Sequence, residues 1–493
     1  MRTRIILFLL IACSGLACAQ DGAVKKIAEV NPPDVALAPL RYLASDELMG
    51  RGITRPEINI AAQYIADQFK SFGVKTVNGA DGYFQNLELW TLIPGEKGSA
   101  SIGKLNFALG KDFVQVMPTD ANLNSQLIYA GHVNETDLAG MNVKNKIVLV
   151  DMGSQTDGTA FRKDFRELPA FQASLIKKGA MAFVVRFIGK ASAWSNVSAR
   201  YNGTRLQIPD EVTGLNTFIV NDTPELQALL VKGYTGGANF TVSGTKRRSI
   251  ALKNVMGYVE GTDPKLKDQY VLLTSHYDHL GVGKPKMEEG KLDSIYNGAR
   301  DNASGTTAVI DAARYFAKYP PARSILFITY TAEESGEIGS HYYAEHPVVP
   351  LKNIVYNLNI DNASYDNTDL ISLVGLGRTT ADEDIKMACA TYGMTVNGDP
   401  TGGQLFYQSD NYPLAKKGVP APTFSFGMKS FGPEVFKRYH QLSDEVGNMD
   451  MKYMMKFVSA YILAAQNIAN DPQTATWTKG DELEKAGQAL YGK

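Results

Sequence analysis

The stretch "VLLTSHYDHLG", residues 271–281, contains the pattern that decides the fold of the second half of this chain. An apolar run from Val271 to Leu273 predicts a buried β-strand. Three polar side chains that serve as metal ligands or as acids and bases in other proteins, His276, Asp278 and His279, follow the run directly. We therefore expect the strand to place His276 at its carboxyl end.

The same arrangement recurs further along the chain. The runs "SILFITYTA", "NIVYNLNI" and "APTFSFG" are predicted strands, and they lead to Glu333 and Glu334, to Asp361, and to a loop that carries His440. Amphipathic helices alternate with these strands, and Asp301 precedes one of them, "ASGTTAVIDAARYFAKY". This alternation predicts an α/β fold with a mixed, mostly parallel sheet covered on both faces. The carboxyl ends of parallel strands share one edge, so we expect a common site there.

Five side chains at that edge form a candidate metal-binding set: His276, Asp301, Glu334, Asp361 and His440. Carboxylates packed this closely would repel one another and take up protons unless cations neutralise them. Nitrogen and oxygen ligands without a thiolate suit two zinc ions about 3.5–4 Å apart, and manganese or cobalt would also be accepted. Glu333 is then free to act as a general base, and Asp278 is placed to accept the second ring N–H of His276. Each motif alone is common in proteins without a metal. The metal site is predicted because all the motifs occur together in one α/β region.

The bulk composition describes a globular protein. A length of 493 residues favours two or three domains, and 44% hydrophobic with 20% charged residues allows a large core. A formal net charge of -1 argues against nucleic acid or an anionic membrane as a partner. No segment after the leader is apolar for long enough to cross a membrane.

The first 19 residues have the pattern of a signal peptide. "MRTR" is a basic start, "IILFLLIA" is an apolar core, and Ala17 and Ala19 are small residues in front of a cleavage site. Cleavage after Ala19 is the preferred interpretation, and "LIAC", ending at Cys13, is similar to a lipoprotein box and leaves a lipid anchor as the alternative. Both predict an exported protein, periplasmic or secreted. Cys389 is then the remaining cysteine, and its neighbours predict a buried structural position.

Three regions follow the leader. From about residue 39 to residue 92 the pattern is helical, with apolar spacing in "NIAAQYIADQFKSFGV" and a stop at Gly73. From about 93 to 244 short β-type runs prevail, with one helix, "AFQASLIKKGA", among them. The α/β alternation occupies residues 250–469, and the polar tail after Asp471 is expected to pack loosely.

The motifs "SHYDHLG", "NGARDNASGT", "TAEESGEIGS", "NLNID" and "RYHQLSDE" together resemble the M28 family of co-catalytic zinc metallopeptidases, which include bacterial aminopeptidases. "YLASDELMGRG" looks like the opening of members with a protease-associated insert, and "AGHVNETDLAGMNVKNKIVLVDMG" with "KKGAMAFVV" looks like that insert. The resemblance implies a zinc-exopeptidase three-layer α/β sandwich interrupted by a β-rich domain. The implied segments are a signal peptide (1–19), the first part of the peptidase domain (20–95), the protease-associated insert (96–247), the main part of the peptidase domain (248–475) and a tail (476–493).

The resemblance also implies a role for each matching residue. One zinc would be bound by His276 and Asp361, the other by Glu334 and His440, with Asp301 as the bridge. Glu333 matches the general base, Asp278 the orienting acid, and Tyr439 a tyrosine that helps to hold the oxyanion. The peptide bond between Asp301 and Asn302 is expected to be cis, as in relatives.

Two positions depart from the family pattern. Arg300 stands where many relatives have Asp or Asn, and we expect it to point away from the metals, towards a carboxylate of the protein or of the substrate. Asn411 stands where relatives often have His, in a loop that shapes the substrate pocket. His279 is assigned either to the support of a ligand or to local hydrogen bonding, and His132 to a structural position.

The expected activity is the hydrolysis of peptides from a free N-terminus, with two Zn²⁺ ions as cofactor and a peptide as substrate. A carboxypeptidase or a glutaminyl cyclase of the same clan is the first alternative. A non-catalytic binding protein on a peptidase scaffold is the second, although such a chain should have lost Glu333 or a ligand, and this one keeps the full set.

Overall fold

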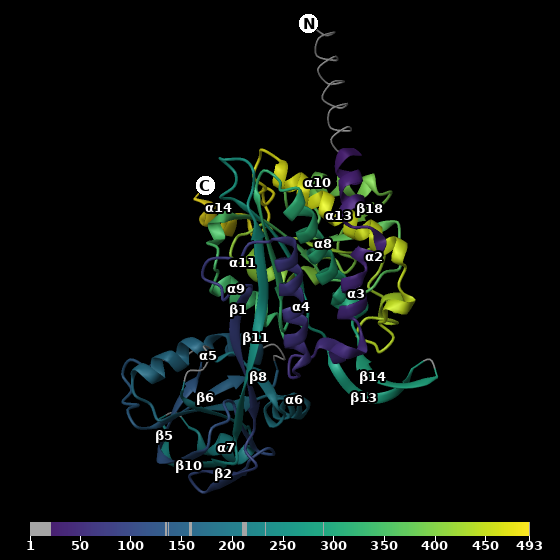
Figure 1. Ribbon diagram of the computed structural model, residues 1–493. Helices are drawn as coiled ribbons and strands as arrows, with labels where there is room; N and C mark the ends of the chain where they lie inside the picture. Colours follow the sequence, from purple (N-terminus) through teal and green to yellow (C-terminus); the bar gives the residue numbers. More distant parts are fainter. Residues whose placement is uncertain are drawn as a thin grey trace. The chain divides into compact units, whose positions relative to one another are not determined.

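The computed structural model describes residues 21–492, with gaps at 134–135, 137, 157–159, 210–213, 232 and 289. The predicted signal peptide, with Cys13, lies outside the described residues. The chain forms two compact units: unit 1 contains the residues up to Leu87 and from Ala251 onwards, and unit 2 contains Glu88–Ile250. Figure 1 shows the elements of both units along the chain.

Unit 1 is built around seven strands of a mixed sheet, in the order β18-β17-β19-β16-β12-β15-β11. Its four central strands, β19, β16, β12 and β15, are parallel to one another, whereas β11 and β17 pair in antiparallel fashion with β15 and β19. The strands of this sheet are β11 (Lys246–Val259), β12 (Tyr270–His276), β15 (Ser324–Tyr330), β16 (Ile354–Ile360), β17 (Leu370–Val374), β18 (Thr395–Asn397) and β19 (Thr423–Phe426). A separate hairpin consists of β13 (Gly281–Glu288) and β14 (Lys291–Tyr296).

Helices cover both faces of this sheet (Figure 1). On one face Leu272 of β12 packs in a cluster with Tyr343 of α9 and Leu414 of α11. Successive strand residues point to opposite faces, so Val271 and Leu273 face the other side, where α8 and α13 contact β12. The helices of unit 1 are α2 (Pro33–Ala36), α3 (Ala38–Leu43), α4 (Glu57–Phe72), α8 (Gly305–Lys318), α9 (Ile338–Glu345), α10 (Asp382–Thr391), α11 (Asn411–Lys416), α12 (Pro433–Phe436), α13 (Met451–Asn470) and α14 (Glu484–Tyr491). The predicted α/β fold class is confirmed.

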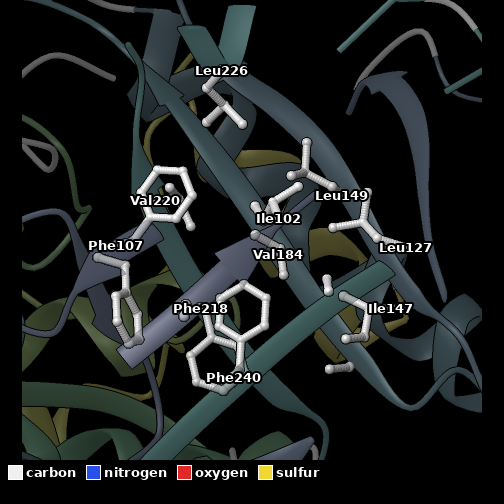
Figure 2. Packing of buried hydrophobic residues seen from close by; sticks show 14 of the residues in the cluster. Ile102, Phe107, Leu127, Ile147, Leu149, Val184, Phe218, Val220, Leu226 and Phe240 are labelled. Atoms are coloured by element: carbon white, nitrogen blue, oxygen red, sulfur yellow. The ribbon is translucent and has the colours of Figure 1, made fainter. Parts of the chain in front are cut away.

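Unit 2 contains an eight-stranded sheet with the order β3-β2-β10-β5-β6-β7-β9-β4. Its core includes Phe218 and Phe240, whose rings stack 4.5 Å apart, and Figure 2 shows them among aliphatic side chains. The strands of this sheet are β2 (Lys97–Ile102), β3 (Leu105–Ala108), β4 (Phe113–Gln115), β5 (Ala121–His132), β6 (Ile147–Gly153), β7 (Ala182–Ile188), β9 (Asn216–Asn221) and β10 (Thr235–Ser243), and β8 (Arg205–Gln207) is not part of it. The helices are α5 (Ala160–Lys177), α6 (Ala191–Asn202) and α7 (Pro224–Leu229).

Several local predictions are confirmed. Helix α4 ends at Gly73, which adopts a left-handed conformation with φ 80° and closes the helix with its N–H. Cys389 is buried and free, and burial raises the pKa of its thiol to about 12. Among the helices of the described residues, none combines the length and apolarity that spanning a membrane requires.

Three local predictions are wrong. The helical region does not extend to Leu92, because β1 (Phe84–Ile93) alternates buried and exposed side chains as a strand does. Unit 2 contains α6 and α7 besides the one predicted helix. The tail after Asp471 is anchored rather than loose, since Trp477 is 5% exposed and its indole N–H donates to the carbonyl of Gly418 at 2.9 Å.

Candidate metal centre

Three neighbouring parallel strands end at the same level beside the candidate site. In the strand register His276, the last residue of β12, is opposite Tyr330, the last residue of β15, and Ser275 is opposite Ile360, the last residue of β16. Glu333 and Glu334 follow β15, and Asp361 follows β16. The sheet therefore brings together side chains that are far apart in the sequence, as the sequence analysis expected.

Asp301 reaches the site from a short helical turn, η3 (Ala299–Ser304), in front of α8. The peptide bond between Asp301 and Asn302 is cis, as the family resemblance implied. The Asn302 side chain donates to the carbonyl of Ile360 at 2.8 Å, and the N–H of Asp301 donates to Asp444 at 3.1 Å. These bonds hold the turn between the end of β16 and the loop that carries His440.

The two carboxylate oxygens of Asp301 face two different groups of side chains. Oδ1 lies 3.3 Å from Nε2 of His276, and this nitrogen is also 3.4 Å from Oδ1 of Asp361. Oδ2 lies 3.2 Å from Nε2 of His440, which in turn is 3.1 Å from Oε2 of Glu334. Asp301 thus stands between two sets of nitrogen and oxygen atoms.

The donor atoms at the centre suit metal ions. The donor atoms of His276, Asp301 and Asp361 lie within 4.8 Å of one another, and so do those of His279, Asp301 and Glu334. Imidazole nitrogens and carboxylate oxygens at such short range are ligands that zinc accepts. Asp301 and His276 are almost fully buried, so their charges need compensation inside the protein.

The electrostatics of the site agree with that chemistry. Burial lowers the pKa of His440, but hydrogen bonds to Asp301 and Glu334 outweigh burial and raise it to about 10. Burial likewise opposes the charged form of Asp301, yet hydrogen bonds from His276 and His440 hold the pKa of this carboxyl far below its usual range. Both shifts reflect the attraction between the imidazoles and the carboxylates of this cluster.

Glu333 lies at the edge of this cluster. Its Oε2 atom is 3.8 Å from Nε2 of His276, and its N–H donates to Oδ1 of Asp278 at 3.0 Å. Burial, assisted by the charges of Asp361, Asp410 and Glu334, raises the pKa of Glu333 well above its usual value, although His276 opposes this. A carboxylate with a raised pKa is a stronger base than an exposed one, which suits proton transfer near neutral pH.

Asp278 contacts His276 differently from the expectation. The second ring nitrogen of His276, Nδ1, lies 3.2 Å from the main-chain carbonyl of Asp278, whereas the carboxylate is 3.8 Å away. The carboxylate instead accepts the N–H of Glu333. Asp278 therefore fixes the ring of His276 through its backbone and the loop of Glu333 through its side chain.

Tyr439 lies next to the cluster. Its ring stacks on the ring of His440 with centroids 3.9 Å apart, and His440 itself has a left-handed backbone with φ 57°. Tyr439 and Asp361 also line a cavity of about 210 Å³, together with the apolar side chains of Val374, Leu405, Ala363, Met428 and Phe431. Buried Asn411, at the start of α11, donates to the carbonyls of Phe406 and Ala421 and so braces the backbone behind this cavity.

The sequence left the role of His279 open and did not predict the contacts of Asp444. His279 lies with its Nδ1 atom 2.7 Å from Oε1 of Glu334, which supports its role beside a ligand. Asp444 accepts hydrogen bonds from the N–H groups of Arg300 and Asp301, and its Oδ1 pairs with the Arg300 guanidinium at 3.0 Å. Arg300 therefore points to a protein carboxylate, as expected. The "RYHQLSDE" motif contained Asp444, but its spacing gave no sign of this contact.

The family model described as "Peptidase family M28" matches residues 254–465, which contain the whole cluster. The part of the chain that contains the cluster therefore matches this peptidase family, which agrees with a metallopeptidase. It is similar to aminopeptidase YwaD of Bacillus subtilis, with 23% identity over 64% of this chain and 67% of that protein. It is also similar to a probable zinc metalloprotease of Pyrenophora teres, with 26% identity over 33% of this chain and 32% of that protein.

Solved structures show the same fold. An aminopeptidase from Aneurinibacillus sp. strain AM-1 aligns with a TM-score of 0.51 at 18% identity, over 93% of this chain and 98% of that one. At this identity the likeness shows that the two folds correspond.

Proposed function

We propose that the protein is an exported di-zinc aminopeptidase that releases N-terminal residues from peptides. The observation that carries this proposal is the position of Asp301, whose two oxygens face His276 with Asp361 on one side and His440 with Glu334 on the other. In this arrangement Asp301 would bridge two zinc ions, and each ion would also have one imidazole and one further carboxylate. Manganese or cobalt would fit the same ligands.

Zinc held by these residues would polarise a carbonyl and make water more acidic. Glu333 takes the proton of the attacking water and returns it to the leaving amine, which its raised pKa favours. The hydroxyl of Tyr439 donates to the oxygen of the scissile carbonyl as negative charge develops there. Asp278 keeps both His276 and Glu333 in place.

The side chain of the residue to be released would occupy the cavity of about 210 Å³ beside Asp361 and Tyr439. Unit 2 is proposed as the protease-associated insert, supported by its eight-stranded sheet and its position in the chain between two parts of unit 1. Export is proposed from the leader pattern of residues 1–19.

The test compares two substrates that differ only at the N-terminus. The purified zinc-loaded protein is assayed with an aminoacyl amide and with the same compound after N-acetylation. We expect hydrolysis of the free amine alone. Hydrolysis of the blocked compound alone would contradict the aminopeptidase proposal.

A further inference from the structure

Arg51 is a fully buried arginine whose guanidinium contacts main-chain carbonyls. It lies at the end of the turn η1 (Asp46–Arg51), in the "DELMGR" stretch, for which the proposed chemistry has no use. Its side chain is 0% exposed. Nε donates to the carbonyl of Tyr277 at 2.7 Å, Nη2 to Gly298 at 2.9 Å, and Nη1 to Asn297 at 2.6 Å and to Leu43.

Three of these four carbonyls, those of Tyr277, Asn297 and Gly298, belong to the two segments that carry the proposed ligands His276 and Asp301. Tyr277 lies between His276 and Asp278, and Gly298 precedes Asp301 by three residues. The β13–β14 hairpin separates the two segments in the chain. One guanidinium therefore ties the exit of β12 to the entrance of η3, at both ends of the hairpin.

The backbone around Arg51 fits the same two segments closely. A Cβ atom on Gly50 would lie 2.4 Å from the carbonyl oxygen of Tyr296, and one on Gly52 would lie 2.9 Å from Cα of Gly281. The Asn297 side chain donates to the carbonyl of Ala44 at 2.9 Å and to Asp46 at 2.8 Å. The residues from Ala44 to Gly52 thus pack directly on both ends of the hairpin.

The charge of Arg51 is compensated at a distance. Burial lowers the pKa of its guanidinium to about 10, and the carboxylates of Asp278, Asp301, Asp444 and Glu334 oppose this shift without accepting a hydrogen bond from it. The group remains cationic at neutral pH. It therefore places a fixed positive charge near the carboxylates of the centre.

We propose that Arg51 is a positioning residue of the metal centre, which sets the spacing between the His276 and Asp301 segments through its carbonyl contacts. This inference rests on the proposed di-zinc function. Without the guanidinium N–H donors of Arg51, the positions of His276 and Asp301 should vary more. Zinc binding should then be weaker even in a chain that remains folded. Supporting contacts behind metal ligands typically change metal affinity by about 10–100-fold.

The test uses Arg51→Lys, which keeps the charge but cannot span four carbonyls, with Arg51→Met, which loses both. Arg323→Lys is the matched control. Arg323 is 1% exposed and also donates to main-chain carbonyls, those of Ile468 and Asp471, but it precedes β15 at the end opposite to Glu333. Full-length proteins are stripped of metal, and zinc affinity is measured by competition with a chelator of known affinity. Circular dichroism and thermal unfolding, each with and without zinc, establish the folded state.

We expect Arg51→Lys to raise the zinc dissociation constant at least tenfold and to reduce the zinc-induced rise in melting temperature. Arg51→Met should weaken zinc binding further. Arg323→Lys should lower the melting temperature and leave the zinc-induced rise unchanged. Wild-type zinc affinity in folded Arg51→Lys would overturn the positioning role alone. Absence of zinc binding by the wild-type protein would overturn the di-zinc function, and this inference with it.

If Arg51→Lys does not fold, Asn297→Ala tests whether the spacing of the same two segments sets zinc affinity, because it releases the 297–298 segment from Ala44 and Asp46 and keeps the guanidinium. We expect a severalfold loss of zinc affinity. An unchanged affinity in that variant would contradict the proposal.

Discussion

At the scale of single residues, orientation decides what the candidate centre can do. His276 and His440 could be predicted as neighbours because each follows a strand of one sheet, and Asp301 because it precedes a helix that packs on that sheet. The direction of each side chain could not, because it depends on loop geometry. Asp278 illustrates this: the turn after β12 brings its carbonyl, rather than its carboxylate, to the ring of His276.

His279 provides the residue-scale prediction. Its ring contacts Oε1 of Glu334, so removing it leaves that carboxylate free to rotate. We expect His279→Ala to weaken zinc binding by about 10–100-fold with the fold intact, measured by chelator competition. His341→Ala is the control, since this half-exposed imidazole lies on α9 and contacts Glu337. Equal zinc affinity in the His279 variant and the wild-type protein would show that Glu334 needs no such support.

At the scale of elements, segments with a strong apolar pattern were predictable, and segments that mix apolar and polar residues were not. Helix α4 and the four parallel strands have strong apolar patterns that local sequence reveals. β1 was assigned to a helical region because its ten residues mix apolar and polar types, and its partner β11 lies far along the chain. The burial of Trp477 was likewise hidden, because it depends on contacts with Gly418 that only the folded sheet provides.

Gly50 is the critical position of the segment that contacts the hairpin. It has φ 66°, and a Cβ atom would collide with the carbonyl oxygens of Tyr296 at 2.4 Å and Gly281 at 2.5 Å. Gly73 also has positive φ, but a Cβ atom there would meet no other atom within 4 Å. We expect Gly73→Ala to cost about 1–2 kcal/mol from backbone strain alone, and Gly50→Ala clearly more. Denaturant unfolding of both variants checks this, and equal losses would contradict it.

Asp311 on α8 makes the stability of unit 1 depend on pH. Burial raises the pKa of its carboxyl to about 7, although Arg314 opposes this shift. In the unfolded chain the same group ionises near pH 4. Between these values the folded protein holds more protons, so this group lowers the unfolding free energy as the pH rises from about 4 to about 7.

Asp311→Asn removes that titration and keeps the shape of the side chain. We expect the difference in melting temperature, variant minus wild type, to be more positive at pH 8 than at pH 4.5. Thermal unfolding of both proteins at the two pH values measures the difference. A constant difference across this range would mean that Asp311 is ionised normally in the folded protein.

At the scale of the whole molecule, the division into two units has a thermodynamic consequence. The proposed zinc ligands all lie in unit 1. A ligand that binds only the folded state stabilises it by about 4 kcal/mol when its free concentration is a thousand times the dissociation constant. We expect metal removal to lower the unfolding temperature of unit 1 and to leave that of unit 2 unchanged.

Differential scanning calorimetry of the full-length protein, with and without a chelator, separates these transitions. The transition of unit 2 is identified as the one whose temperature falls in a destabilised core variant such as Phe240→Ala, which removes a buried ring from the core of unit 2. If the chelator shifted the transition of unit 2, which Phe240→Ala identifies, and left the transition of unit 1 unchanged, the metal would lie outside unit 1.

The most direct measurement of the central claim is the metal content of the purified wild-type protein beside Glu333→Ala. If Asp301 bridges two ions and Glu333 acts only as a base, both proteins should contain two zinc ions per chain. Peptide hydrolysis should fall by about 10²–10⁴-fold in the variant. A wild-type protein that binds no zinc, or a variant that remains fully active, would contradict the account.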